Sequence, residues 1–295
     1  FTYDGTAKVA VAAHDLYTVT EGSATNAGSY EAVVTLNDTV NYEWAQEFNG
    51  KVAWSIEKAT HNMSGIEFKD KTVTYDGNEY KVEITGTLPE GVEVSYTTNK
   101  GTNAGTYNAV ASFTGDANYN DIPDMEATLT VNKATYDMSG VVFANKTVTY
   151  NSESHSILAT NLPNGVTVAY TGNAQTEAGE YTITATFTGD VNYNAIPSQT
   201  AKLVIEKAQV TKPVADTTVF VYNSQAQTYT IAASDLYTVS GNVETLAGNY
   251  TVTVALKDKA NYEWTDGSTD DKTFTFTINK KKLDAPTDVV GRVKA

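Results

Sequence analysis

The stretch NAGTY at residues 103–107 recurs in modified form elsewhere in the chain. The three other copies read NAGSY at 26–30, EAGEY at 177–181 and LAGNY at 246–250. Each Tyr opens a run of alternating apolar and polar residues, such as Ala109, Ala111 and Phe113 after Tyr107. A period of two residues predicts a β-strand with one buried face. Four copies of this pattern predict a chain built from four β-rich repeats.

A second alternating run ends each repeat at a lysine, and these lysines lie about 74 residues apart. They are Lys58, Lys133, Lys207 and Lys280. We therefore expect an array of four domains: repeat one at 1–58, which lacks its first strand, repeat two at 59–133, repeat three at 134–207 and repeat four at 208–280. Residues 281–295 contain APTDVVGRV, which looks like the opening strand of a fibronectin type III domain. They are predicted to be a linker leading into such a domain.

The pattern within a repeat predicts short strands and no helix. In repeat two the expected strands are 66–68, 71–76, 79–85, 92–98, 105–114 and 125–132, with turn residues between them. Six or seven short strands are typical of a small immunoglobulin-like β-sandwich. A β-grasp unit remains the alternative, although that fold needs a helix across its sheet.

The Tyr of each copy is predicted to be structural. In immunoglobulin-type sandwiches a Tyr near the start of strand F bonds through its hydroxyl to the chain upstream, and the residue two positions later faces inward. The sequence therefore predicts tyrosine corners at Tyr30, Tyr107, Tyr181 and Tyr250. The preceding Gly leaves room for the tight corner.

Composition excludes several classes of protein. The net charge of −15 and the pI of about 4.5 disfavour binding to nucleic acid or to anionic lipid. The absence of Cys excludes disulfides and thiol chemistry. No apolar run approaches the roughly 20 residues of a membrane span, so no membrane insertion is expected. Because the chain starts at Phe1 without a signal-peptide pattern, we expect it to be part of a longer protein.

Several motifs resemble the bacterial immunoglobulin-like surface repeats of MBG and YDG type. They are TVTYDG (72–77), LPEGVEVSY (88–96), NAGTY (103–107), FTGDANYN (113–120) and LTVNKA (129–134). The resemblance covers 59–207 strongly and 1–58 and 208–280 more loosely. It implies an exported, often wall-attached bacterial protein that acts in adhesion or as a spacer, and it implies no catalysis.

The histidines do not predict a catalytic site. His14, His61 and His155 align with Ser234, Tyr136 and Tyr80 in other repeats. A catalytic base would not be expected to exchange with Tyr or Ser between copies. No metalloprotease, nucleophile-elbow or phosphate-loop motif occurs either. We therefore expect a protein that is not an enzyme and has no cofactor.

Each repeat also carries an Asp followed by Asn-Tyr. The four sets are Asp38, Asn41 and Tyr42; Asp116, Asn118 and Tyr119; Asp190, Asn192 and Tyr193; and Asp258, Asn261 and Tyr262. These sets predict an Asx-type turn with the Tyr packed beneath it. Contact with carbohydrate or protein, and binding of calcium through the oxygen atoms, stay open as alternatives.

Two tryptophans, Trp44 and Trp264, follow these sets in matching NYEW sequences. A buried core role is expected, and an aromatic platform for a sugar is the alternative. Tyr42, Trp44, Tyr262 and Trp264 are thus the candidate ligand-binding residues.

Together these features predict a non-catalytic spacer in a bacterial cell-surface or secreted protein. The alternatives are an adhesion module for host or dietary glycan or protein, and an accessory region of a secreted polysaccharide-degrading enzyme. Neighbouring domains of the same polypeptide are the expected partners, and the chain is expected to be a monomer outside the cell.

Overall fold

The computed structural model describes residues 1–285 and contains only strands, turns and loops in that range. The prediction of an all-β, multi-domain chain is confirmed. The β-grasp alternative fails because no helix crosses a sheet anywhere in residues 1–285. The described part of the chain therefore has no helix that could span a membrane. Residues 286–295, where most of the predicted fibronectin-like strand falls, lie outside the described range.

Repeat two shows the common plan of the sheet. Its strands are β6 (Lys71–Thr74), β8 (Glu93–Thr97), β10 (Gly105–Thr114) and β11 (Met125–Asn132), in the order β6-β11-β10-β8. The β8-β10-β11 part is antiparallel and has the C-F-G order of an immunoglobulin-type sheet. β6 lies parallel to β11 at the edge, with Lys71 opposite Leu129.

The other repeats follow the same order. Repeat three uses β12 (Lys146–Thr149), β15 (Gln199–Glu206), β14 (Gly179–Thr188) and β13 (Thr167–Thr171). Repeat four uses β17 (Phe220–Val221), β23 (Lys272–Asn279), β21 (Gly248–Leu256) and β19 (Tyr237–Ser240). Repeat one has three strands, β2 (Tyr17–Thr20), β4 (Gly28–Leu36) and β5 (Lys51–Ile56), and its parallel edge is a single bridge between Thr2 and Glu57.

The second layer of each repeat consists of short ladders. They are β7 (Tyr80–Lys81) with β9 (Lys100–Gly101), β18 (Gln227–Thr228) with β20 (Val243–Glu244), β1 (Lys8–Val9) with β3 (Ser23–Ala24), and a bridge from His155 to Gln175 in repeat three. Repeat four adds a parallel pair, β16 (Ala208–Val210) with β22 (Tyr262–Trp264). These short ladders leave many backbone groups without a strand partner.

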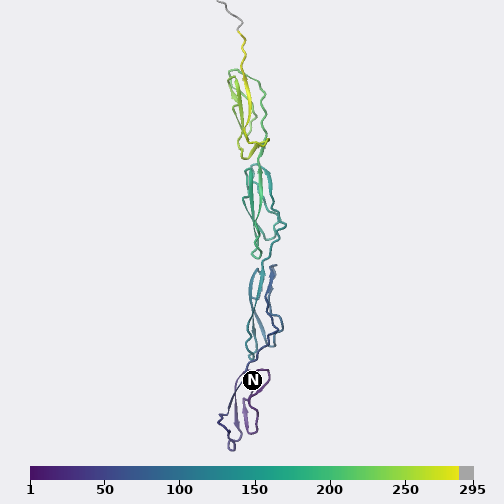
Figure 1. Ribbon diagram of the computed structural model, residues 1–295, viewed down its shortest axis with the longest axis vertical. Helices are drawn as coiled ribbons and strands as arrows, with labels where there is room; N and C mark the ends of the chain where they lie inside the picture. Colours follow the sequence, from purple (N-terminus) through teal and green to yellow (C-terminus); the bar gives the residue numbers. More distant parts are fainter. Residues whose placement is uncertain (286–295) are drawn as a thin grey trace, which may run out of the picture. The chain divides into compact units, whose positions relative to one another are not determined.

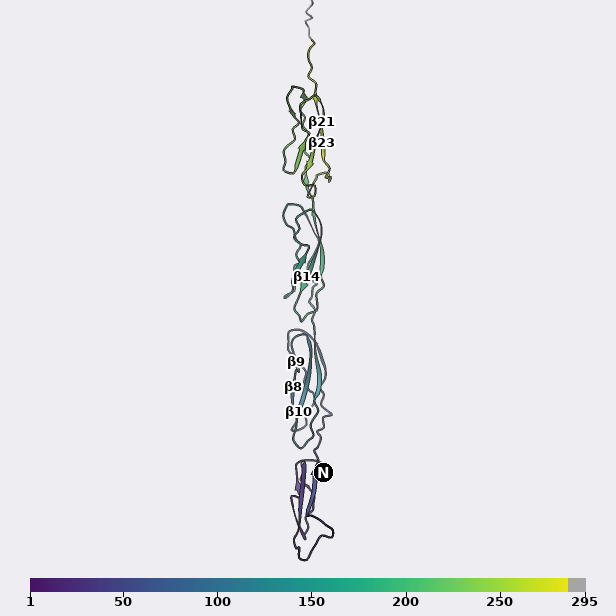
Figure 2. The ribbon, with the colours of Figure 1, turned by 90° about the vertical axis from the view of Figure 1, so that its left-hand side faces the viewer.

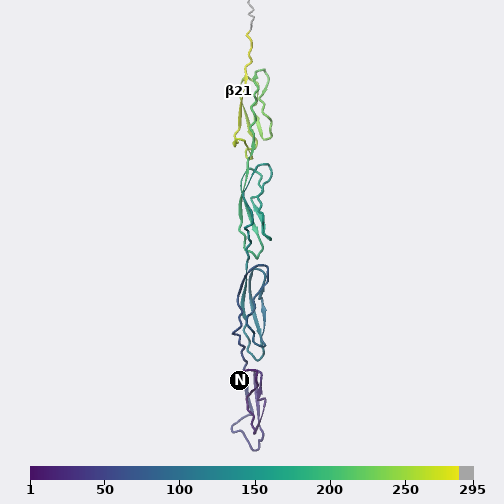
Figure 3. The same cartoon turned by 90° about the vertical axis from the view of Figure 1, so that its right-hand side faces the viewer.

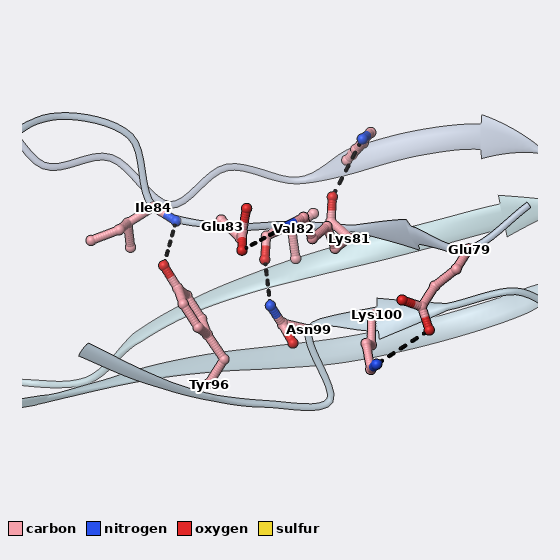
Figure 4. A network of polar contacts seen from close by, with 9 residues as sticks. Glu79, Lys81, Val82, Glu83, Ile84, Tyr96, Asn99 and Lys100 are labelled. Carbon is pink, nitrogen blue, oxygen red and sulfur yellow. Dashed lines mark hydrogen bonds and ion pairs between the residues drawn. The ribbon is translucent and has the colours of Figure 1, made fainter.

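Side chains bond several of these groups in repeat two (Figure 4). The Tyr96 hydroxyl accepts a hydrogen bond from the N–H of Ile84 at 3.0 Å, and the Asn99 amide donates to the carbonyl of Val82 at 3.0 Å. Repeat three repeats this arrangement with Tyr170 and Asn173. The layer is therefore attached to the sheet by side chains as much as by strand pairing.

The core of each repeat lies between these two layers. In repeat two the buried side chains are Val82, Ala109, Leu129 and Val131, and all but Val82 come from the inward faces of β10 and β11. This is the face that alternation in the sequence predicts. In repeat three Ile183 replaces Ala109, and in repeat four Val252 does, so aliphatic packing occupies the centre of every sheet.

The described chain forms two compact units, each with its own internal contacts. One comprises Phe1–Tyr136 together with Asp190–Asn194, and the other comprises Asp137–Gly189 and the residues from Ala195 onward. The four sheets can be followed by colour in Figure 1, and β21 and β23 are labelled in Figure 2 and β21 again in Figure 3. The assignment of 190–194 to the first unit shows that a loop of repeat three packs against repeat two. The four domain boundaries stay a prediction.

Candidate functional site

The Asn-Tyr loop after β10 contacts the AGxY corner of repeat one. The Oδ1 atom of Asn118 accepts a hydrogen bond from the N–H of Ala27 at 2.8 Å, and its Nδ2 atom lies 3.4 Å from Oδ1 of Asn26. The next residue, Tyr119, packs edge-on against Tyr3 with the ring centroids 5.5 Å apart. We call this combination a joint. In a joint, an Asn side chain accepts a hydrogen bond from a backbone N–H of the AGxY corner, and the Tyr after that Asn packs edge-on against a Tyr of the other repeat.

The first unit contains a second joint of the same kind. Asn192, which is only 6% exposed, accepts a hydrogen bond from the N–H of Ala104 at 2.7 Å. Its amide lies 3.3 Å from Oδ1 of Asn103. Tyr193 packs edge-on against Tyr75 at 5.7 Å. The loop that carries these residues therefore belongs with repeat two by its contacts.

The second unit contains the third joint, between repeats three and four. Asn261, only 3% exposed, accepts a hydrogen bond from the N–H of Ala178 at 2.7 Å and donates to the Glu177 carboxylate. Tyr262 packs edge-on against Tyr150 at 5.4 Å. In all three joints an Asn Oδ1 accepts a hydrogen bond from the corner Ala N–H and a Tyr packs edge-on against another Tyr, whereas the acceptor of the Asn amide differs.

The chain leaving each repeat runs beside the loop of the next. The N–H of Ala59 donates to the carbonyl of Asn118 at 3.0 Å, and the N–H of Asn120 returns a bond to Ala59 at 2.7 Å. Ala134 makes the same pair of bonds with Asn192 and Asn194. Backbone pairing therefore fixes the register of the loop at each of these joints.

An Asp stabilises the conformation of the joint loop through hydrogen bonds within the loop itself. Asp258 accepts hydrogen bonds from the N–H groups of Ala260 and Asn261 at 3.0 and 3.1 Å, and from the Asn261 amide at 2.8 Å. The side-chain bond from Asn261, followed by the backbone bonds, lowers the pKa of Asp258 below its usual value. The Asx turn thus exists, and it aims the Asn amide at the neighbouring corner.

The AGxY Tyr shapes the other side of the joint. Each Tyr hydroxyl donates to the carbonyl four residues upstream: Tyr30 to Asn26 at 2.6 Å, Tyr107 to Asn103 at 2.8 Å, Tyr181 to Glu177 at 2.9 Å and Tyr250 to Leu246 at 2.8 Å. At Gly248 a Cβ would lie 3.2 Å from the Tyr250 hydroxyl, so a side chain there would crowd the corner. The closed corner leaves the N–H of the intervening Ala free to face the neighbour.

The four candidate ligand-binding residues differ widely in exposure. Tyr42 is 48% exposed, and Trp44 lines a groove of about 510 Å³ with Val34 and Phe48 among its other walls. Tyr262 is half-buried in the third joint. Trp264 is fully buried and donates its indole N–H to the carbonyl of Asp270 at 2.8 Å, so it offers no surface to a ligand.

The strand β16 accounts for the difference in exposure between Trp44 and Trp264. In repeat four Val210 of β16 packs beside Trp264 and Tyr237. Trp44 meets Tyr17 in nearly the same ring geometry, 5.9 Å and 50° against 5.9 Å and 43° in repeat four. Among the described residues no strand pairs with residues 42–44 as β16 pairs with β22, and Trp44 borders the open groove.

The histidines and carboxylates of residues 1–285 do not form a metal-binding cluster. No cluster of three or more His, Asp or Glu side chains is arranged to hold a metal ion there. His61 is buried and stacks on Tyr119 at 3.8 Å, and Tyr136 stacks on Tyr193 in the same way at 4.0 Å. The His therefore fills an aromatic position of the joint.

Sequence reasoning assigned the Asn-Tyr sets to turns and missed their role in the joints. The Asn amide bonds to a backbone N–H 91 residues away in the first joint, and a backbone group has no sequence signature. The available signal was indirect. Asn and Tyr recur in all four repeats where a turn alone would accept many residues.

Comparison with protein families finds a match for the two central repeats. Residues 65–135 and residues 139–209 each match the family model of the MBG domain. These two segments are similar to MBG domains. Both segments carry an AGxY corner and an Asn-Tyr loop, so the two halves of a joint lie within the matched sequence. No curated protein matches the chain.

Solved structures give only weak likenesses. SGBP-B of the Bacteroides ovatus mixed-linkage glucan utilization locus, solved in complex with a mixed-linkage heptasaccharide, is 14% identical over 72% of this chain and 67% of its own, with a TM-score of 0.19. Titin domains I67–I69 are 14% identical over 74% and 99%, with a TM-score of 0.23. Surface layer protein SbsC, domains 1–6, is 13% identical over 90% and 48%, with a TM-score of 0.21. Scores of this size decide nothing about function.

Proposed function

We propose that the chain is a non-catalytic spacer of a bacterial cell-surface or secreted protein, in which joints connect β-repeats in series. The observation that carries the proposal is the threefold recurrence of one joint, with Asn118, Asn192 and Asn261 on equivalent corner amides. The residues that recur from repeat to repeat lie at the contacts between repeats.

Two further features support a spacer. The two central repeats are similar to MBG domains, which the sequence resemblance associates with exported proteins, and the acidic composition favours solubility. Each joint combines a part-buried hydrogen bond with an aromatic contact. Such contacts limit bending between neighbours, which a spacer requires.

Small-angle scattering on the full chain tests this proposal. Four units with a radius of gyration near 11 Å each, connected in series, span roughly 120–150 Å. One globule of the same length has a radius of gyration near 19 Å, and so a largest dimension of about 50 Å. A compact scattering curve would reject the spacer.

The cellular location of the protein can be tested in the organism that makes it. Antibodies against the chain should label intact cells or the culture medium, and added protease should remove the signal from intact cells. Signal found only after lysis would reject a surface or secreted protein.

Direct adhesion is the second candidate, and the groove beside Trp44 favours it. Tyr42 and Trp44 place aromatic surface next to a cavity, an arrangement that suits sugar rings. A glycan array probed with the full chain and with Trp44→Ala separates the two functions. Binding that is lost in Trp44→Ala would make the chain an adhesion module, and no binding would leave the spacer.

A further inference from the structure

The first and last strands of the sheet are parallel neighbours in both central repeats. In repeat two β6 pairs with β11 over four residues, from Lys71 opposite Leu129 to Thr74 opposite Asn132. In repeat three β12 pairs with β15 over four residues in the same way. The chain enters each sheet through the first of these strands and leaves it through the last, so tension along the chain acts on this pair of strands.

Tension along the chain loads the β6–β11 pair in shear. The preceding chain pulls on β6 at Lys71, and the following chain pulls on β11 at Asn132. Because the strands are parallel, these two points lie at opposite ends of the pair, and the strands are drawn past each other. The hydrogen bonds of a parallel pair are evenly spaced, so they bear this load together instead of one after another. β11 cannot peel away, since β10 is bonded to its other edge.

Further hydrogen bonds extend the strand pair at both ends. Before β6 the Asp70 carboxylate accepts a bond from the N–H of Thr128 at 2.7 Å. After β6 the N–H of Tyr75 donates to the carbonyl of Asn132 at 2.8 Å. Repeat three has the same two bonds at 2.8 Å each, from the N–H of Lys202 to the Asn145 side chain and from the N–H of Tyr150 to the carbonyl of Glu206.

The motif KTVTY supplies the first strand of both central sheets and attaches it to the rest of the repeat. Val73 packs against the buried cluster of repeat two. The Nζ atom of Lys71 donates to the carbonyl of Lys81 in the second layer at 3.3 Å. The equivalent residues of repeat three, Val148 and Lys146, make the corresponding contacts. Neither first strand can slide along the last strand without losing these contacts as well.

Repeat four has a shorter version of this pair. β17 pairs with β23 over two residues, beginning with Phe220 opposite Ile278. Thr218 occupies the position that Lys71 holds in repeat two, so the contact of the lysine with the second layer is missing. The repeats therefore differ in the number of bonds that resist shear.

We propose that the β6–β11 and β12–β15 pairs are mechanical clamps, which keep the two central repeats folded when the ends of the chain are pulled apart. Each clamp consists of the strand pair, the side-chain bond before it from Asp70 or Asn145, and the contacts of KTVTY. Under tension repeat four unfolds before repeats two and three. The inference rests on the proposed spacer function, because a spacer transmits force between the parts that it connects.

Pulling repeat two in two directions within the full chain tests the clamp. Because the sequence has no Cys, handles can be attached to pairs of introduced cysteines at exposed positions. Lys69→Cys with Lys133→Cys loads opposite ends of the β6–β11 pair, in shear. Asn78→Cys with Lys133→Cys loads the same end, so the bonds break one at a time. At one constant force the lifetime in shear should be at least about tenfold longer, since a factor of ten corresponds to one or two net hydrogen bonds.

A variant at the start of β6 supplies a second readout. Asp70→Ala removes one hydrogen bond of the clamp, so the lifetime in shear should fall about 2- to 12-fold. Pulling at Asn78 and Lys133 opens the pair from its other end, and the lifetime in that direction should not change. A residue that merely stabilised the fold would shorten both lifetimes. Asp124→Ala, at another exposed Asp of repeat two, is the matched control and should change neither lifetime.

Repeat four provides the third comparison. With handles at Thr217→Cys and Lys280→Cys it is pulled in shear like repeat two, and its lifetime at the same force should be shorter because two residue pairs bear the load. The proposal would be overturned by equal lifetimes in the two directions, by a lifetime in shear that Asp70→Ala leaves unchanged, or by a repeat four that outlasts repeat two. Scattering decides the spacer independently, because a compact curve would reject the spacer and leave the clamp measurements valid.

Discussion

The Oδ1 atom of Asn261 accepts a hydrogen bond at 2.7 Å from the N–H of Ala178, 83 residues earlier in the chain. The Asn side chain is 3% exposed and also donates to Asp258 and Glu177, so both ends of its amide are bonded. One short side chain thereby connects an Asx turn in repeat four to a tyrosine corner in repeat three.

We predict that Asn261→Ala opens the third joint. The substitution leaves the N–H of Ala178 without its acceptor, which costs about 1–3 kcal/mol. Hydrogen exchange at Ala178 should therefore accelerate about 5- to 140-fold, since 1.4 kcal/mol is tenfold. Asn41→Ala is the matched control, because its side chain is exposed, and it should leave exchange at Ala178 unchanged. Equal exchange rates in Asn261→Ala and the native chain would show that the bond contributes nothing.

The strands with regular alternation were predicted best. In repeat two the expected 105–114 and 125–132 match β10 and β11 in the structure. The expected strand at 79–85 is reduced to Tyr80–Lys81. The Tyr96 hydroxyl and the Asn99 amide bond to backbone groups of Ile84 and Val82 in its place. Alternation reports which face is buried, but it does not report whether a strand or a side chain satisfies the backbone.

The candidate site was harder to predict because its partners lie in different repeats. Trp44 and Trp264 share the same NYEW context, yet only Trp264 is covered, because Val210 reaches it from β16. Nothing within the four residues distinguishes the two. The pairing of Asn118 with Ala27 has the same cause, since the acceptor of the pair is visible in sequence and the donor is a backbone amide.

We predict opposite outcomes for alanine at two glycines of repeat two. A Cβ at Gly101 would lie 2.3 Å from the ring of Tyr107, so the ring would shift and weaken its bond to Asn103. Overpacking of this kind costs about 1–3 kcal/mol, which lowers the melting temperature of a domain this size by roughly 4–20 °C. At Gly105 the nearest atom would be 4.0 Å away, so Gly105→Ala should be tolerated. Calorimetry gives the melting temperatures of the two variants, and equal temperatures would contradict the prediction.

We predict that His61→Tyr strengthens the first joint. The buried Nε2 atom of His61 has no hydrogen-bond partner among residues 1–285, whereas the hydroxyl of Tyr136, its counterpart, accepts a bond from the N–H of Asp190 at 3.0 Å. A Tyr at position 61 can accept from the N–H of Asp116 in the same way. We expect a gain of about 0.5–1.5 kcal/mol and slower exchange at Asp116.

The reverse substitution is the matched control for this prediction. Tyr136→His removes the acceptor of the Asp190 N–H, so exchange at Asp190 should accelerate. If His61→Tyr left exchange at Asp116 unchanged while Tyr136→His had its expected effect, the two positions would not be equivalent.

We predict that repeat four loses stability in acid through Asp216. The side-chain bond from Thr218, followed by the backbone bonds from Thr230 and Thr218, lowers the pKa of Asp216 to about 2 from its usual 3.8. A lowered pKa means that the folded state favours the carboxylate. Its contribution is therefore complete above pH 3.8 and is lost as the pH falls from 3.8 towards 2.

Fluorescence of Trp264 isolates this effect. Trp44→Phe with Trp54→Phe leaves Trp264, buried in repeat four, as the only Trp of the chain. In that background Asp216→Asn should be less stable to urea at pH 7, and the difference should shrink as the pH falls from 4 to 2. Asp258 and Asp266, whose pKa values are also lowered, are present in both proteins and cancel in the comparison. A difference that stays constant down to pH 2 would show that the Asp216 carboxylate does not stabilise the fold.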